Sequence, residues 1–258
     1  MNDNEMTLLP DERIDQVNEQ LRLIQKKQGL TYGTDAFLLA SYIRPAKHAL
    51  AVELGSGTGI ISLLLASRAK LGHIWAVEIQ PSFSELISRN IAINGFEKQI
   101  TPLCADLREL RPEQFGKEVD LVFSNPPYMR CDTGKRNLSD EKYIARHEVY
   151  GTIGDFCRTA AKLLRYGGKF VTVWRPDRMT DLLGALHESA LEPKRMTFVH
   201  ADADAEPCMV LTEAIKGGAP SLRISAPLLL YEPMQNQASK SRRLTAKAEE
   251  IYRNCAFD

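Results

Sequence analysis

The sequence predicts an α/β fold with a doubly wound, mostly parallel sheet of seven strands. Apolar runs of five to eight residues alternate along the chain with longer stretches of helical composition, and this alternation is typical of parallel sheets. Only residues 201–206 join the last two apolar runs, so these runs are expected to pair as an antiparallel C-terminal hairpin. A chain of 258 residues, 44% of them hydrophobic, is long enough to bury such a core.

Each element follows from its composition and its boundary residues. The predicted strands, in chain order, are 49–54, 73–78, 100–104, 119–124, 169–174, 194–200 and 208–215. The predicted helices are 35–43, 60–70, 82–93, 155–166 and 177–190. Thr34 or Asp35 is the expected N-cap of the first helix, because its side-chain oxygen can accept from an unpaired backbone N–H. Asn94-Gly95 and Gly167-Gly168 are expected helix ends.

The chain divides into three parts on this interpretation. Residues 1–45 form an N-terminal segment that carries the start of the first helix, residues 46–232 form the main domain, and residues 233–258 form a polar, basic extension with a short helix near 244–252. A connection of about 24 residues, 129–152, follows the fourth strand. Loops of this length in compact domains are often functional.

Composition excludes several classes of protein. Lys and Arg total 33, as do Asp and Glu, but residues 126–178 hold eleven basic residues against six acidic ones, an excess that suits a polyanionic ligand. Five cysteines without a CxxC pair predict neither a disulfide framework nor a metal site. The polar N-terminus and the short apolar runs predict a cytoplasmic protein without a signal peptide or membrane span.

A glycine-rich run follows the first predicted strand, in Glu53-Leu-Gly55-Ser-Gly57-Thr-Gly59. Glycines after a strand allow a tight turn and the close approach of a ligand. The dinucleotide fingerprint places its third glycine at the sixth position, where this chain has Ile60, so NAD binding is disfavoured. The run also lacks the Gly-Lys-Ser/Thr of phosphate-binding loops.

The tetrapeptide Asn125-Pro126-Pro127-Tyr128 ends the fourth predicted strand. Its two prolines fix the backbone, so the Asn125 side chain and the Pro126 carbonyl are held in a rigid frame. In parallel sheets ligands bind at the carboxyl ends of the strands, and the glycine run, Glu78, Asp106 and this tetrapeptide all lie at such ends.

These motifs resemble those of the class I S-adenosylmethionine (SAM) methyltransferases, which have a Rossmann-like fold. The E-x-G-x-G-x-G run is similar to their first motif, and the NPPY tetrapeptide is similar to that of the amino-methyltransferases. Gln25–Ala40, which contains Thr34-Asp35, and Arg146-His147-Glu148 resemble the bacterial tRNA1(Val) (adenine(37)-N6)-methyltransferase family. The resemblance covers roughly residues 6–232.

The resemblance implies a role for each group of residues. SAM is expected to contact Thr34, Asp35, Glu53, Gly55, Gly57, Gly59, Glu78 and Asp106. In this superfamily an acid in the position of Glu78 binds ribose hydroxyls, and one in the position of Asp106 meets the adenine amino group. The expected catalytic residues are Asn125, Pro126, Pro127 and Tyr128, which would orient a planar amine and stack on its ring.

The implied substrate is an adenine in a tRNA anticodon loop, methylated at N6. An unpaired base is readily turned into a pocket, and Arg130, Lys135 and Arg136 are the candidate phosphate contacts. NPPY alone leaves other amines open, namely guanine N2 of ribosomal RNA, adenine of DNA and the glutamine amide of a protein. A non-catalytic module that binds SAM or RNA is the alternative of another class. No metal is expected, and the oligomeric state is left open.

Overall fold

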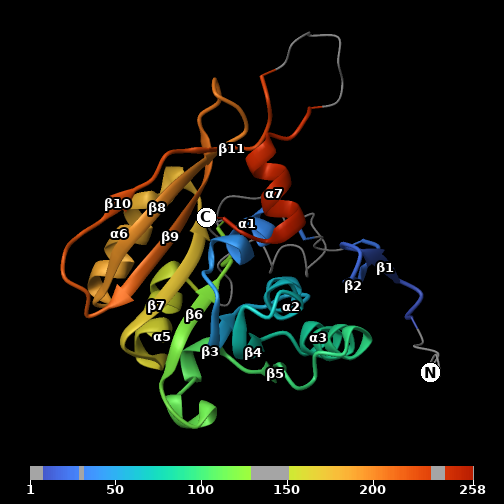
Figure 1. The fold of residues 1–258 in the computed structure, drawn as a ribbon. Helices are drawn as coiled ribbons and strands as arrows, with labels where there is room; N and C mark the ends of the chain where they lie inside the picture. The colour runs from blue at the N-terminus through green and yellow to red at the C-terminus, as the bar shows by residue number, and fades with distance from the viewer. Residues whose placement is uncertain (1–7, 29–31, 129–150, 234–241, 258) are drawn as a thin grey trace.

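The computed structural model describes residues 8–28, 32–128, 151–233 and 242–257, which fold around one large sheet (Figure 1). Its long strands are β3 (Ala46–Leu54), β4 (Leu71–Glu78), β5 (Ile100–Cys104), β6 (Val119–Ser124), β7 (Leu164–Trp174), β8 (Leu191–His200) and β9 (Pro207–Lys216). These are the seven predicted strands. Two short strands, β10 (Arg223–Ile224) and β11 (Leu228–Leu229), pair with β8 and make the sheet nine-stranded in the described part of the chain.

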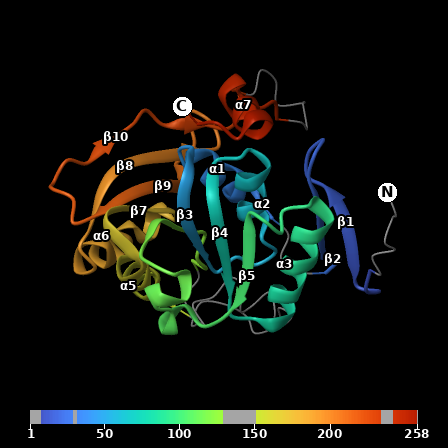
Figure 2. The ribbon, with the colours of Figure 1, turned by 60° about the horizontal axis from the view of Figure 1, so that its bottom comes forward.

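The strand order is β10-β8-β9-β7-β6-β3-β4-β5, and Figure 2 allows most of it to be followed across the sheet. Strands β3 to β7 run parallel, while β9 is antiparallel to both β7 and β8, which confirms the predicted hairpin. From β3 the chain proceeds outward through β4 to β5 and then returns to β6 on the other side of β3. The order therefore reverses between β3 and β6, where ligands bind in doubly wound sheets.

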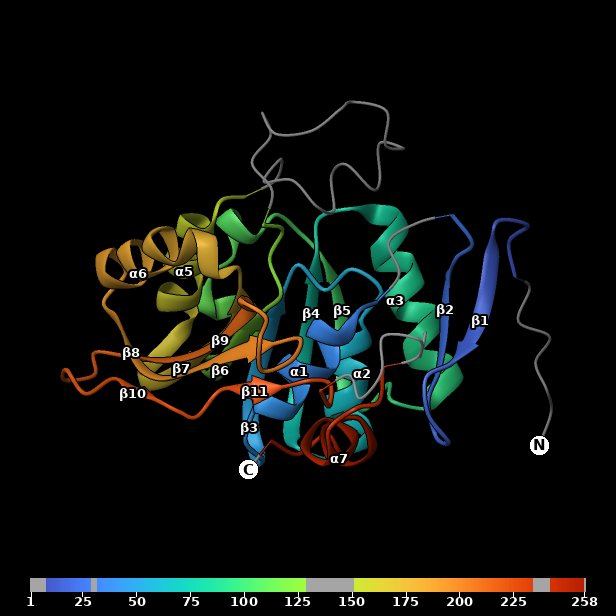
Figure 3. The same cartoon turned by 90° about the horizontal axis from the view of Figure 1, so that it is seen from above.

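The helices cover both faces of this sheet. They are α1 (Thr34–Tyr42), α2 (Ile60–Ser67), α3 (Pro81–Asn94), α5 (Ile153–Leu163), α6 (Met179–Glu188) and α7 (Ala246–Asn254). Helices α5 and α6 lie on one face, and α1, α2 and α7 lie on the other (Figure 3). Three short 3₁₀ turns, η1 (Leu107–Glu109), η2 (Pro112–Phe115) and η3 (Pro176–Arg178), complete the described helical elements. None of the described helices is both long and apolar enough to cross a bilayer.

Three boundary predictions were wrong. The N-cap of α1 is Gly33, because the Asp35 carboxylate is used in contacts with residues far along the chain. Helix α2 ends at Ser67, where the chain turns through Ala69 at φ 47°. Helix α5 ends at Leu163, and residues 164–168 belong to β7, whose pairing with β6 shifts register there. The two glycines thus lie at an irregular part of a strand.

An antiparallel hairpin of β1 (Glu12–Gln16) and β2 (Arg22–Lys26) precedes α1 and was not predicted. It lies beside α3 (Figures 1 and 2), where Asn90 and Asn94 bond the backbone of β2 and Arg89 pairs with Glu12 at 2.7 Å. Its short strands resemble ordinary polar loop sequence, so the hairpin depends on these tertiary contacts.

Helix α1 is fixed at its C-terminal end by two buried cations. The Lys70 ammonium donates to the carbonyls of Ala40, Ser41 and Ile43 at 2.9, 3.2 and 2.7 Å, and Lys70 is only 5% exposed. Arg195 donates to the Tyr42 carbonyl at 2.6 Å. Positive charge at a helix C-terminus satisfies the orphan carbonyls and the helix dipole. The position of α1 is therefore strongly specified.

Candidate functional site

A cavity of about 260 Å³ lies where β3 and β6 end and α1 begins. Its lining residues come from all three places and include Tyr32, Asp35, Glu53, Gly55, Ser56, Gly57, Thr58, Ile60 and the whole Asn125–Tyr128 tetrapeptide. This is the topological switch point of the sheet. The structure thus brings together the glycine run, the tetrapeptide and Asp35, which are widely separated in sequence.

The glycine run forms the turn between β3 and α2. Gly55, Gly57 and Gly59 have φ values of 71°, 55° and 80°, in the left-handed region that other residues adopt only with strain. A Cβ added at Gly57 would meet no atom within 4 Å, so this position faces open space. The Gly57 N–H donates to the Glu78 carboxylate at 2.9 Å, which holds the loop against the end of β4.

Glu53 is the only acidic residue of β3 and is 1% exposed. Its carboxyl accepts hydrogen bonds from the Ser62 N–H, at 3.2 Å, and from the Ser62 hydroxyl. Burial raises the pKa of Glu53 to about 8; the Ser62 hydrogen bonds only partly oppose this effect, and Glu78 adds to it. At neutral pH the cavity therefore has a mostly protonated carboxyl in its wall.

Glu78 lies at the end of β4 and is also buried. Its two carboxylate oxygens accept from the N–H groups of Gly57 and Gln80, at 2.9 and 3.0 Å. Burial raises the pKa of Glu78, and these backbone hydrogen bonds offset part of that rise. Glu78 does not line the cavity itself, but it lies against the loop that does.

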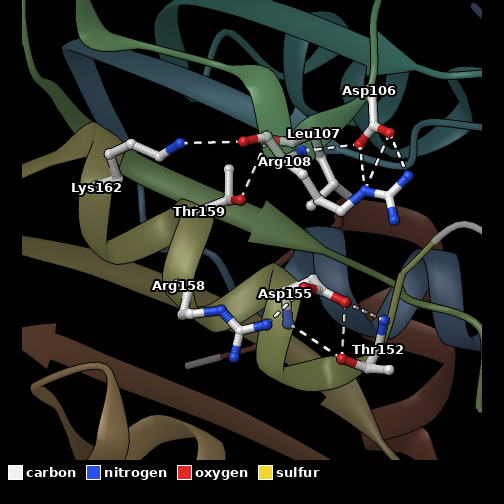
Figure 4. Close-up of polar contacts among 8 residues, drawn as sticks. All are labelled: Asp106, Leu107, Arg108, Thr152, Asp155, Arg158, Thr159 and Lys162. Carbon is white, nitrogen blue, oxygen red and sulfur yellow. Dashed lines mark hydrogen bonds and ion pairs between the residues drawn. The ribbon is translucent and has the colours of Figure 1, made fainter.

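Asp106 follows β5 and is not among the residues that line the cavity; Figure 4 shows its contacts with Arg108. It is the N-cap of η1, where it accepts from the Arg108 N–H at 2.9 Å, and its carboxylate also accepts from the Arg108 guanidinium. The hydrogen bonds from Arg108 lower the pKa of Asp106. Asp106 is thus ionised and paired with Arg108, and it does not line the cavity, but the N–H of the preceding Ala105 donates to the Glu78 carbonyl at 3.1 Å and keeps it beside the end of β4.

The tetrapeptide is anchored from several sides. The Ser124 hydroxyl donates to the Leu54 carbonyl at 2.7 Å, which joins the ends of β6 and β3. The Arg178 guanidinium donates to the Tyr128 carbonyl at 2.8 Å, and it also lies 5.1 Å from the centre of the Trp174 ring. Trp174 contacts the Tyr128 ring edge-on, with centroids 6.0 Å apart. These contacts restrict the motion of the tetrapeptide.

Asp35, Asn125 and Tyr128 form a compact polar triangle. The Asn125 amide donates to the Asp35 carboxylate at 2.7 Å, and the Tyr128 hydroxyl lies 2.7 Å from both Asp35 Oδ2 and Asn125 Oδ1. Burial, and then the charge of Asp35, raise the pKa of Tyr128 well above its usual value. Tyr128 is therefore a neutral phenol at every physiological pH.

A second cavity, of about 340 Å³, lies on the other side of this triangle. It is lined by Thr34, Asp35, Tyr128, Trp174, Arg175, Cys208 and Met209. Asp35 and Tyr128 line both cavities, so the triangle lies between them. One cavity has the glycine loop in its wall, and the other has an aromatic ring and an exposed arginine.

Sequence reasoning missed part of this site. Trp174 and Arg175 follow the same rule as the other candidates, since they lie at the end of a predicted parallel strand, and that position could have found them. No motif or position in the sequence indicated that Arg178 belongs to the site. Arg130, Lys135, Arg136 and the Arg146–Glu148 stretch lie outside the described residues.

Neither a further cavity nor a group of metal-ligating side chains adds a functional site in the described residues. A cavity of about 450 Å³ lies at the opposite edge of the sheet, where β3, β6 and β7 begin, and its wall includes residues 43–49 and Asp120. Ligands of doubly wound sheets bind at the other edge. Within the described ranges, no three His, Cys, Asp or Glu side chains group as a metal site would require.

Comparisons with known proteins agree with this geometry. The TRM5/TYW2 methyltransferase domain matches residues 44–150. A tRNA1(Val) (adenine(37)-N6)-methyltransferase of Parabacteroides distasonis is 29% identical over 230 residues, which cover 88% of this chain and 92% of the relative. The enzyme of the same name from Phocaeicola vulgatus is 28% identical over 197 residues, covering 75% and 80%. The resemblance expected from the motifs is confirmed.

Solved structures confirm the fold. A predicted O-methyltransferase from Agrobacterium tumefaciens superposes with a TM-score of 0.66 at 22% identity, covering 86% of this chain and 97% of the other. The tRNA m1G37 methyltransferase of M. jannaschii superposes with a TM-score of 0.57 at 15% identity, covering 81% and 58%. The fold is that of methyltransferases, as the strand order already indicates.

Proposed function

We propose that this chain, a SAM-dependent methyltransferase, transfers the methyl group to N6 of an adenine in a tRNA anticodon loop. One observation carries the proposal: two cavities meet at the Asp35–Asn125–Tyr128 triangle, one beside the glycine loop and the other beside Trp174 and Arg175. Transfer between two ligands needs two sites that meet at the reacting atoms.

The first cavity suits SAM by its chemistry. When bound, SAM supplies an electrophilic methyl group on a sulfonium, and its ammonium adds a second positive charge. The Asp35 carboxylate lines this cavity and Glu78 lies behind the glycine loop, and such acids attract a cation, whereas Glu53, mostly protonated at neutral pH, adds a polar group to the wall. Backbone N–H groups of the loop and the Glu78 carboxylate are the candidate ribose contacts. Asp106 would meet the adenine of SAM only beyond this cavity, at the end of β5.

The second cavity suits a flat base. Its volume lies within the range of small-molecule sites, about 300–1,000 Å³. Tyr128 is the aromatic ring that lines both cavities, and Arg175, which is exposed, can contact a phosphate beside the base. The amine of that base would have to reach past Tyr128 to the first cavity, where Asn125 Oδ1 and the Pro126 carbonyl would accept from it and favour a nitrogen lone pair directed at the methyl group. Arg130, Lys135 and Arg136 remain proposed contacts for tRNA phosphates.

The adenine of tRNA is favoured over the other amines. The relatives that match most of this chain bear the name of a tRNA adenine-N6 enzyme, and residues 126–178 carry an excess of basic residues suited to RNA. A tRNA substrate places the enzyme in the cytoplasm.

The test is transfer of labelled methyl from SAM to total tRNA from a bacterial strain that lacks this protein, followed by nucleoside mass spectrometry. N6-methyladenosine is the expected product. Labelled N2-methylguanosine would move the target to guanine, and binding of SAM without any labelled nucleoside would redirect the search to protein substrates.

The variant that tests the role of Asn125 in the same assay is Asn125→Ala. It removes the amide that orients the amine, so turnover should fall at least about a hundredfold, the usual loss for one electrostatic contact in a transition state. SAM affinity, measured by calorimetry, should stay within about threefold, because Asn125 faces the amine. An equal loss of both would contradict the role given to Asn125.

A further inference from the structure

The Asp35–Asn125–Tyr128 triangle has fewer donor hydrogens than short polar contacts. A carboxylate can only accept, so the Asn125 amide must direct its Nδ2–H toward Asp35, at 2.7 Å. Asn125 Oδ1 then faces the Tyr128 hydroxyl, again at 2.7 Å. The phenol has one hydrogen for two oxygen partners, Asp35 Oδ2 and Asn125 Oδ1. One of these short O···O contacts therefore lacks a proton.

The phenol hydrogen has a preferred partner. Hydrogen bonds to a charged acceptor are about twice as strong as those to a neutral one, so the phenol donates to Asp35. The Tyr128 oxygen then presents a lone pair to its surroundings, beside Asn125 Oδ1. The triangle thus has a vacant place for one proton, and it lies between the two cavities.

Methylation of an amine creates a proton that needs such a place. The nitrogen lone pair forms the new N–C bond, while the C–S bond breaks and its electron pair stays on sulfur. The nitrogen is left positively charged and must lose one of its hydrogens as a proton. The side chains of Asn125 and Pro127 offer no base for it, and the carboxyl of Glu53 is mostly protonated already at neutral pH.

We propose that Asp35 is the positioning and proton-accepting partner of the amine site: it fixes the direction of the Asn125 amide and receives, through Tyr128, the proton that the amine loses. The amine proton passes to Tyr128 Oη as the phenol hydrogen moves to Asp35 Oδ2. Asp35 becomes neutral, the amine becomes neutral, and Tyr128 is regenerated. This inference rests on the proposed function for the amine and adds a role for a residue of α1.

The surroundings of Asp35 suit this role. Its second oxygen, Oδ1, accepts from the Ala36 N–H at 3.0 Å, so the carboxylate is held by its own helix while Oδ2 serves the triangle. Among the described residues, the other charged or titratable groups that line the two cavities or act on the triangle are Arg175 at the end of β7, Cys208 of β9, Tyr252 of α7, Glu53 of β3 and Tyr32. Arg175 acts on Tyr128 in the opposite sense to Asp35, by favouring the ionised phenol.

The experiment compares Asp35→Asn with the wild type and with Asp120→Asn. Asp120 lies near the start of β6, the strand that ends just before Asn125. It is therefore at the opposite edge of the sheet from Asn125, where it pairs with Arg165. Single-turnover methylation of tRNA is measured between pH 5 and 9. The wild-type rate should rise with pH on the acid side, because only an ionised carboxylate can take the proton. Asp35→Asn should be slower by about 10²–10³-fold, the usual contribution of a general base, without that rise, whereas Asp120→Asn should match the wild type.

Two further measurements separate proton transfer from a purely structural role. Asp35→Glu keeps the carboxylate and should retain the pH dependence with a smaller loss of rate. The ionisation of Tyr128 is followed by ultraviolet absorbance as the difference between each protein and its Tyr128→Phe counterpart. Removal of the Asp35 charge should shift the Tyr128 midpoint to lower pH. Rates are compared at saturating SAM, with the affinity of each variant for SAM measured by calorimetry, because Asp35 also lines the cavity assigned to SAM.

The outcomes are distinct. Wild-type rates in Asp35→Asn, or slow rates that keep the wild-type pH dependence, would overturn proton acceptance. An unchanged Tyr128 midpoint would overturn it as well, because the carboxylate would then not act on the phenol. Failure of the wild type to methylate any tRNA adenine would contradict the proposed function instead, and the Tyr128 titration would still decide whether Asp35 controls the phenol proton.

Discussion

The buried carboxyl of Glu53 should make the stability of this protein depend on pH in a specific range. Its side chain is 1% exposed, and its pKa is raised to about 8, mainly by burial. Replacement by Gln keeps the shape, one acceptor for the Ser62 donors and one donor group, as in the protonated carboxyl. The variant cannot ionise, so it isolates the cost of the buried charge.

The magnitude follows from the two pKa values. Between the ordinary value of 4.5 and about 8, the folded protein holds a proton that the unfolded chain has released. The stability that the folded protein gains from the protonated Glu53 is therefore fully present below about pH 4.5 and is lost as pH rises through about 8. At about 1.36 kcal/mol per pH unit, the loss amounts to at most about 5 kcal/mol, and relaxation around the charge makes about 3–5 kcal/mol the expected range.

Urea denaturation of wild type and Glu53→Gln at intervals from pH 5 to 9 measures this effect. Over this pH range the free energy of unfolding of the variant, relative to wild type, should increase by about 3–4 kcal/mol, because the part of the change below pH 5 is not sampled. Asp120→Asn is the control, because hydrogen bonds from Arg165 and the Leu50 N–H outweigh burial and lower the pKa of Asp120. Its difference from wild type should change only at acid pH. Parallel curves for wild type and Glu53→Gln, within about 0.5 kcal/mol, would refute the assignment of a neutral Glu53.

Three further predictions concern the elements around the site. Glu78→Ala should weaken SAM binding by at least about tenfold in calorimetry, with less change in turnover at saturating SAM, because Glu78 holds the Gly57 N–H; a loss confined to turnover would contradict this. Lys70→Met should lower the free energy of unfolding by about 3–5 kcal/mol in urea, since three buried carbonyls at the end of α1 lose their donor; a loss under about 1 kcal/mol would mean that water replaces the ammonium. Tyr252→Phe should cost about 1 kcal/mol in thermal unfolding, because the hydroxyl bonds the Thr34 side chain at 2.8 Å, and an unchanged midpoint would show that this contact is dispensable.

The elements that sequence could predict are those specified by local residues. Buried parallel strands are continuous apolar runs, so β3, β4 and β6 were found close to their observed bounds. The glycine loop was found because only glycine adopts its positive φ angles without strain. Position at the strand ends then sufficed to place Asn125 and Tyr128 beside the glycine loop.

The contacts that sequence could not predict join residues far apart. Nothing near Asp35 indicates that one oxygen of its carboxylate meets Asn125, 90 positions away, while the other accepts from the Ala36 N–H of its own helix. The contact of Asp106 with Arg108, two residues on, is local, whereas its expected contact with the adenine of SAM stays a prediction. The hairpin β1–β2 escaped prediction because its short strands gain stability from α3, and such pairs are marginal alone.

Helix α1 explains why residues outside the main sheet matter to the site. Its N-terminal turn carries Asp35 to the tetrapeptide, its C-terminal end is fixed by Lys70, and its side packs against α7, where the rings of Phe37 and Tyr252 lie 5.1 Å apart. An isolated nine-residue helix would not hold its shape in water. The orientation of a carboxylate at its first turn therefore depends on contacts along its whole length. It follows that α7, which the sequence predicted as a short helix near 244–252 in a basic extension, belongs to the framework that holds the amine site in place.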